Sequence, residues 1–116
     1  MSDWQPSPFI KLMGVRIVSR TPERSEAEVV NREDLCNRRK VMHGGAIMAL
    51  ADIMGGMTAT AGLPAGSRTA TIESKTNFFA AVPKGDMVQD SHTLSRASAP
   101  RLAFWMLWMP ACVRLW

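Results

Sequence analysis

Alternating apolar and polar positions predict two neighbouring strands near the start of the chain. "VRIVSR", residues 15–20, and "SEAEVVN", residues 25–31, both alternate with a period of two, and the "TPER" between them is typical of a turn. In "SPFIKLMG", which comes before them, Ser7 and Pro8 favour the start of a helix and Gly14 favours its end. The pattern therefore predicts a short helix followed by an antiparallel pair of strands.

The middle of the chain predicts a long helix and a long strand. Residues 32–42, "REDLCNRRKVM", are polar and aperiodic, which is typical of a loop. Over about residues 44–63 apolar side chains lie on nearly all sides of a helix, which indicates a buried helix. Residues 68–82 alternate again, and "PKGD" then turns the chain into a strand over about residues 87–94. This order predicts an α+β fold in which one antiparallel sheet wraps around the central helix.

The composition indicates one globular domain over residues 1–116, because 47% of the residues are hydrophobic and 21% are charged. The net charge of +4 is unevenly placed, since residues 1–90 carry 11 basic and 10 acidic side chains. No basic stripe with interleaved aromatic residues is present, so we expect no nucleic-acid partner.

We expect neither a metal nor a cofactor, because Cys36 and Cys112 are isolated and belong to no Cys/His cluster. The longest apolar run is too short to cross a bilayer, and "MSDWQPSPFI" lacks the features of an export signal. The expected location is therefore the cytoplasm, with no membrane association.

The stretch "VMHGGAIMALAD", residues 41–52, contains the clearest candidate chemistry. Asp52 falls inside the apolar helix, where an unpaired carboxylate costs several kcal/mol. It is either satisfied structurally, by a hydroxyl or another helix N-terminus, or used chemically. The two glycines begin the helix, whose free N–H groups suit an oxyanion, a phosphate or simple capping.

Two stretches, "CNRRKVMHGGAIMALADIMGG" and "TIESKTNFFAAVPKGD", together resemble the hotdog-fold acyl-CoA thioesterases of the PaaI type. That family's pattern is an asparagine, HGG six residues later, an acid in the helix, and an N-F strand that ends in a G-D turn. The matching residues are Asn37, His43, Gly44, Gly45, Asp52 and Asn77. The resemblance covers about residues 9–90 and implies the hotdog fold.

The resemblance implies hydrolysis of an acyl-CoA thioester to the free acid and CoA. In the family, the acid at the Asp52 position activates water or attacks directly, while the amide at the Gly44 position, assisted at the Asn37 position, polarises the thioester carbonyl. Glu73 matches a polar residue that orients the water. His43 either holds the glycine loop or acts as an acid–base group. The expected CoA-binding residues, which a solvated loop explains equally well, are Gly45, Arg38, Arg39, Lys40 and Lys84.

The helix geometry indicates a site that is shared between subunits. Gly44 and Asp52 are eight residues apart, or about 12 Å along a helix, yet an oxyanion donor and a base must both lie close to the reacting atoms. We therefore expect Gly44, Asn37 and His43 of one subunit to meet Asp52 and Glu73 of another, in a homodimer or homotetramer. The Gly55–Gly56 pair suits such a close contact.

The acyl group is not defined by the sequence. Phe78, Phe79, Met48 and Met54 suit either an apolar pocket for aryl-acetyl or medium-chain acyl groups or the packing of the core.

Residues 91–116 form an atypical tail with no acidic residue, no alternation and three of the four tryptophans. The family usually continues with two further long strands, so we expect a frameshift or truncation from about residue 88. The alternative is a genuine strand built on "LAFWMLWM". A second functional hypothesis is therefore a catalytically impaired or merely acyl-CoA-binding hotdog protein. A hydratase is disfavoured, because no histidine follows Asp52 before His92.

Overall fold

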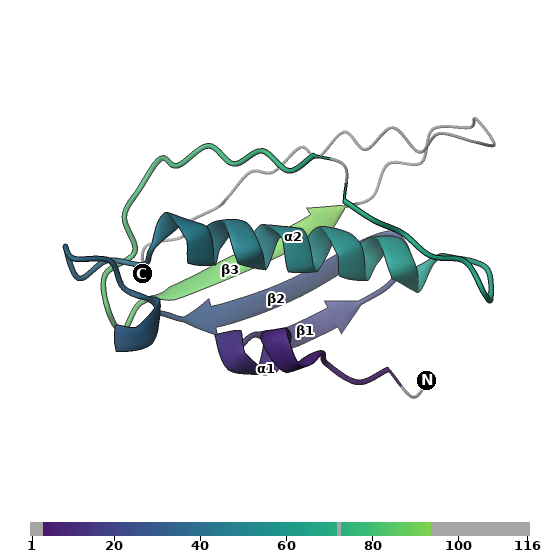
Figure 1. Ribbon diagram of the computed structural model, residues 1–116, viewed down its shortest axis with the longest axis horizontal. Helices are drawn as coiled ribbons and strands as arrows, with labels where there is room; N and C mark the ends of the chain where they lie inside the picture. Colours follow the sequence, from purple (N-terminus) through teal and green to yellow (C-terminus); the bar gives the residue numbers. More distant parts are fainter. Residues whose placement is uncertain (1–3, 72, 94–116) are drawn as a thin grey trace.

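The computed structural model describes residues 4–71 and 73–93 and gives an α+β arrangement in which one long helix lies across a sheet (Figure 1). In chain order the elements are α1 (Pro8–Met13), β1 (Arg16–Arg20), β2 (Arg24–Val30), the short 3-10 helix η1 (Glu33–Leu35), α2 (Gly44–Ala61) and β3 (Met87–Thr93). The predicted first helix, the first two strands, the central helix and the strand from residue 87 are all confirmed, with shifts of one or two residues at their ends. The predicted loop over residues 32–42 also contains η1.

The short helix α1 is fixed at both ends. The Ser7 side chain accepts a hydrogen bond from the Ile10 N–H at 3.3 Å, and Gly14 ends the helix at φ 72°, a conformation that glycine adopts without strain. The Arg32 guanidinium donates to the carbonyl oxygens of Leu12 and Met13, which are among the last carbonyls of the helix. These contacts hold α1 beside the sheet.

The described strands form one antiparallel sheet in the order β1-β2-β3. Ala27 of β2 lies opposite Asp90 of β3, and Val29 lies opposite Val88. Between β1 and β2 the register shifts around Val18, whose side chain is half exposed, so the simple alternation expected for residues 15–20 is interrupted by an irregularity.

The core lies between α2 and one face of the sheet. Leu50, Met54 and Met57 of α2 belong to the same buried cluster as Val29 and Val88. The sheet covers only one side of the helix. The expectation of a helix buried on all sides is therefore wrong for the outer face of α2 in this chain, and Asp52 on that face is exposed.

The prediction of a strand over residues 68–82 is wrong, because no described residue of this segment belongs to a strand. Figure 1 shows it as a coil that runs back along α2 toward the helix N-terminus. Strands require a neighbouring backbone to complete their hydrogen bonds, and the described residues provide one only at the end of this segment. There, Val82 O accepts from Met42 N at 2.8 Å and from Asn31 Nδ2 at 2.9 Å.

The alternation that suggested the strand is nevertheless visible in the burial of the segment. Ser74 and Thr76 are partly buried, whereas Glu73, Lys75 and Asn77 are exposed. The expected alternation is therefore present over residues 73–77, whereas Ala70 and Phe78 of the same expected face are exposed.

The atypical tail lies mostly outside the described residues, which end at Thr93. Residues 88–93 pair with β2 in continuous register through β3, and this pairing uses backbone groups. The predicted change of reading frame, the single domain over residues 1–116 and the strand in "LAFWMLWM" stay predictions. Among the described helices, none is long and apolar enough to cross a membrane.

Candidate active site

His43 begins α2 by capping the helix with its ring. His43 Nδ1 accepts a hydrogen bond from Gly45 N at 2.8 Å, and the His43 carbonyl accepts from Ala46 N and Ile47 N. A Cβ on Gly45 would lie 3.0 Å from Nδ1, so the glycine leaves room for the ring. This geometry matches the loop-holding role considered for His43, and the Gly45 N–H is occupied by the cap.

Gly44 is the position in the first turn whose N–H stays available. Within the described part of the chain no acceptor lies within hydrogen-bonding distance of this N–H. A helix N-terminus carries a partial positive charge, so such a group favours an anionic oxygen. The Phe78 ring lies over the same turn, where its nearest carbons would be 3.4 Å from a Cβ on Gly44.

Asn37 organises the loop that leads to this helix. Its Oδ1 accepts from Arg39 N at 2.8 Å and from Val41 N at 3.4 Å, while its backbone N–H donates to Val41 O at 2.8 Å. The bend places Lys40 at φ 62°, in the left-handed region. The side-chain amide Nδ2 of Asn37 has no acceptor among the described residues, so one donor remains for a ligand.

Asp52 is held by a residue that the sequence reasoning missed. The Thr71 hydroxyl donates to Asp52 Oδ1 at 2.7 Å across the exposed face of α2. Asp52 was expected to be buried, and the contact with a hydroxyl corresponds to one of the compensations considered for it. Glu73, the residue matched to the water-orienting position, lies two residues further along the same segment. Aligning the family pattern two residues earlier in this segment would have identified Thr71.

A groove of about 350 Å³ runs across the C-terminal half of α2. We call it the α2 groove. Its floor is formed by α2 between residues 51 and 60, and the flanking residues, all from outside the helix, are Trp4, Ser7, Ile10, Thr69, Ala70, Thr71, Glu73 and Ser74. The groove thus contains Asp52 and Glu73 together, whereas Gly44, His43 and Asn37 do not line it.

The apolar residues expected to line the pocket lie elsewhere. Met54 is completely buried in the core, while Met48, Phe78 and Phe79 are exposed by 41%, 52% and 84%. None of the four lines the α2 groove. Met54 therefore follows the core-packing alternative, and a pocket lined by Met48, Phe78 and Phe79 stays a prediction.

The basic loop is partly neutralised by Glu33. Lys40 Nζ and Lys84 Nζ lie 2.7 and 2.8 Å from the two oxygens of this carboxylate. The hydrogen bonds from Lys40 and then Lys84 lower the pKa of Glu33 to about 2, and the hydrogen bond to Glu33 raises the pKa of Lys84. Arg38 and Arg39 are exposed beside this cluster and form no ion pair with a described residue. The described residues contain no group of three metal-ligating side chains.

Known proteins resemble this chain in both sequence and fold. The sequence model of the thioesterase superfamily matches residues 39–92. A protein of Saccharolobus solfataricus, whose name proposes an esterase, is 31% identical over 90 residues, which cover 78% of this chain and 64% of that protein.

Solved structures show the same architecture. A conserved protein from Pseudomonas aeruginosa superposes with a TM-score of 0.73 at 29% identity, over 79% of this chain and 73% of that chain. The phenylacetic acid degradation protein PaaI from Thermus thermophilus, solved as a point mutant, gives a TM-score of 0.71 at 21% identity, over 79% of this chain and 76% of that chain.

By its fold, the chain is a hotdog-fold protein, and its residues 39–92 resemble the thioesterase superfamily. The PaaI structure shares this fold, and the motifs from Asn37 onward indicate a resemblance to the PaaI-type thioesterases. The chain spans 64% of the length of its Saccharolobus relative, and the matches define neither the substrate nor the catalytic residues.

Proposed function

We propose that the protein hydrolyses an acyl-CoA thioester to the free acid and CoA. The observation that carries this proposal is the Asp52 carboxylate in the α2 groove, held by Thr71 on one oxygen. The other oxygen of Asp52 forms no hydrogen bond with a described residue and is free to accept a proton from water. We expect such a hydrolase to act in the cytoplasm.

The reaction needs a base and an oxyanion donor. Asp52 removes a proton from water as the water oxygen bonds to the thioester carbon, and the Gly44 N–H of the partner subunit donates to the resulting oxyanion. Collapse of this intermediate breaks the carbon–sulfur bond, and the departing CoA thiolate takes the proton from Asp52. Thr71 fixes the carboxylate, while Glu73 contacts the water from the rim. Direct attack by Asp52 on the carbonyl is the alternative route.

Two copies are required because Gly44 and Asp52 lie about 12 Å apart along one uninterrupted helix. A homodimer, alone or within a homotetramer, would bring the N-terminal turn of one α2 to the α2 groove of the other.

The basic loop supplies positive charge for the phosphates of CoA. Arg38 and Arg39 contribute two charges, and Lys40 and Lys84 contribute a net charge of about one because both pair with the single carboxylate of Glu33.

Replacing Asp52 tests the base. Asp52→Asn keeps an oxygen that accepts from Thr71 but cannot take a proton, so turnover should fall about 10² to 10⁴-fold while acyl-CoA binding persists. The assay is hydrolysis of aromatic and aliphatic acyl-CoA thioesters, normalised to the folded fraction. Turnover within a few-fold of the wild type would refute the assignment. Binding without turnover by the wild type would instead support the non-catalytic acyl-CoA-binding protein.

Replacing Gly44 tests the oxyanion donor. Proline is well tolerated at the first position of a helix and lacks an N–H, and His43 already has the extended backbone that precedes a proline. Gly44→Pro should therefore preserve α2 and lower kcat about 10² to 10³-fold. Gly44→Ala, which keeps the N–H and would meet Phe78 at ordinary contact distance, is the matched control and should stay active.

Mixing the two inactive variants tests whether the site is shared. In a random mixture of Asp52→Asn and Gly44→Pro subunits, about half of the dimers are mixed, and one of the two sites in each contains neither substitution. Activity should recover to about a quarter of the wild-type value. No recovery in a mixture shown to exchange subunits would place both groups of each site on one chain.

A further inference from the structure

We propose that Trp4 closes one end of the α2 groove and limits the length of the acyl group that the enzyme accepts. This inference rests on the proposed thioester hydrolysis. The occupant we assign to the groove is a straight-chain acyl group of medium length, with the CoA portion outside.

The N-terminal segment forms one wall of the groove. Trp4, Ser7 and Ile10 line the groove together with Asp52, Thr71 and the C-terminal half of α2. A chain bound with its carbonyl at Asp52 and extending along the groove toward the N-terminal segment would meet the indole ring. The side chains on this side of the groove are mainly apolar, as an acyl chain requires.

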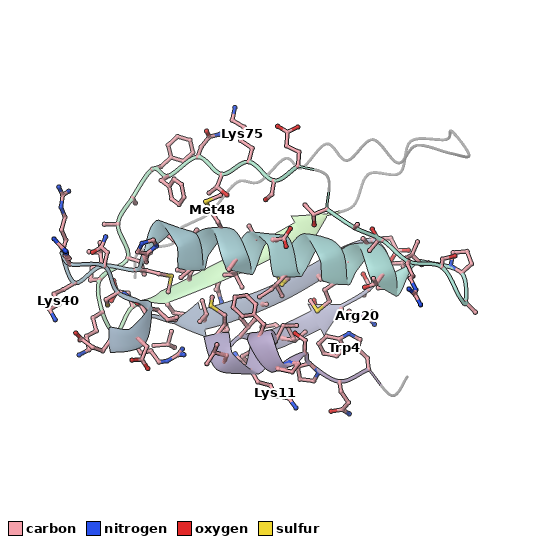
Figure 2. The ribbon with its side chains drawn as sticks, in the orientation of Figure 1. Trp4, Lys11, Arg20, Lys40, Met48 and Lys75 are labelled. Atoms are coloured by element: carbon pink, nitrogen blue, oxygen red, sulfur yellow. The ribbon has the colours of Figure 1, made fainter. Side chains whose placement is uncertain are left out.

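Trp4 is anchored rather than loosely placed. The Arg20 guanidinium lies 5.3 Å from the centre of the indole ring, within the range of a cation–π interaction, and Figure 2 shows the two side chains together beside the C-terminal half of α2. Trp4 also packs against the buried core cluster. The following helix α1 is held by its Ser7 cap and by Arg32. The wall therefore has a fixed position against which chain length can be measured.

The size and contents of the groove favour an acyl group as the occupant. A volume of about 350 Å³ lies near the lower end of the range for small-ligand sites, which is too small for a whole acyl-CoA molecule. Gly55 and Gly56 leave the floor without side chains, and a Cβ on Gly56 would meet no atom within 4 Å. The Asp52 and Glu73 carboxylates connect this apolar space to the proposed chemistry.

The test compares chain-length profiles. We would measure kcat/KM for straight-chain acyl-CoA thioesters from butyryl to palmitoyl with the wild type, Trp4→Ala and Trp4→Phe. Removing the indole should raise the ratio of kcat/KM for lauroyl-CoA over hexanoyl-CoA about 10-fold, and Trp4→Phe should give a smaller rise. The matched control is Phe9→Ala, because Phe9 is a half-exposed aromatic residue of the same segment that does not line the groove. Its ratio should stay at the wild-type value.

Binding separates this inference from the proposed function. The affinities of non-hydrolysable thioether analogues of the same chain lengths should show the same shift in Trp4→Ala, with or without turnover. If the wild type showed no turnover while Trp4→Ala shifted the affinity ratio, the proposed hydrolysis would be overturned and the role of Trp4 would stand. An equal effect on every chain length, or no effect, would overturn the role of Trp4. If sedimentation showed a changed oligomeric state for Trp4→Ala while the ratio stayed unchanged, the inference would also be overturned, since Trp4 would then serve subunit assembly and not acyl-chain length.

Discussion

Replacing Asp90 by asparagine should make the protein more stable above pH 6. Asp90 faces α2 from β3 and is only 5% exposed, and its Oδ2 has no hydrogen-bond partner among the described residues. Burial raises the pKa of Asp90 from its ordinary value near 3.8 to about 6, and the hydrogen bond from the Ser91 backbone opposes this only partly.

The sign and size of the effect follow from the two pKa values. Between about pH 4 and pH 6 the unfolded chain releases the Asp90 proton while the folded chain retains it, so the free energy of unfolding falls as the pH rises through this window. The difference between the two pKa values corresponds to about 3 kcal/mol lost above pH 6. Glu33, with its pKa lowered to about 2, loses its contribution as the pH falls below 4.5, which overlaps only the acid end of this window and affects the wild type and the Asp90 variant alike.

The assay is urea unfolding followed by circular dichroism at fixed protein concentration, from pH 4 to pH 8, for the wild type and Asp90→Asn. The gap between the two should widen by about 3 kcal/mol over this range. Asp34→Asn is the matched control, because the Asp34 side chain is 85% exposed, and its curve should parallel the wild type. Parallel curves for Asp90→Asn would refute the reasoning, since they would mean that the carboxylate is solvated or paired in the folded protein.

Three further substitutions test packing and capping, each by urea unfolding. Gly56→Ala should raise the free energy of unfolding by about 0.5–1 kcal/mol, because a Cβ there meets nothing within 4 Å; a loss would indicate that a second copy packs on this residue. His43→Ala should cost about 0.5–2 kcal/mol through loss of the acceptor for Gly45 N, and His43→Asn should recover part of it. Asn31→Ala should cost about 1–3 kcal/mol, because it removes the buried hydrogen bond to Val82 O; an unchanged midpoint would contradict this.

The sequence predicted those elements whose stabilising contacts are local or lie on the nearest neighbours. α1 has its cap at Ser7 and its end at Gly14, and β1 and β2 are joined by a short turn, so a local pattern contains the information that they require. The segment over residues 68–82 has the same alternation, but a strand also depends on a distant backbone. The alternation alone could not show whether that partner is present.

Burial of Asp52 was mispredicted for a related reason. Hydropathy along α2 describes every side of the helix at once, whereas the sheet covers only the side that carries Leu50 and Met54. The α2 groove uses Asp52 and the Gly55–Gly56 pair outside that side and also reaches Met57 of the core. A helix that is apolar all round therefore predicts that both faces have partners, without showing that both partners belong to the same chain.

The separation of the candidate site into two halves could be predicted because it depends only on helix geometry. α2 is continuous from Gly44 to Ala61, so no local movement brings its first turn to Asp52. The structure gives each half its own surroundings: Phe78 lies over Gly44, while Thr71 holds Asp52 within the groove. Thr71 itself could not be identified from spacing, since its contact with the helix depends on how an unpaired segment crosses α2. If Gly44 and Asp52 act on one thioester, the outer face of α2 must therefore be the surface on which two copies meet.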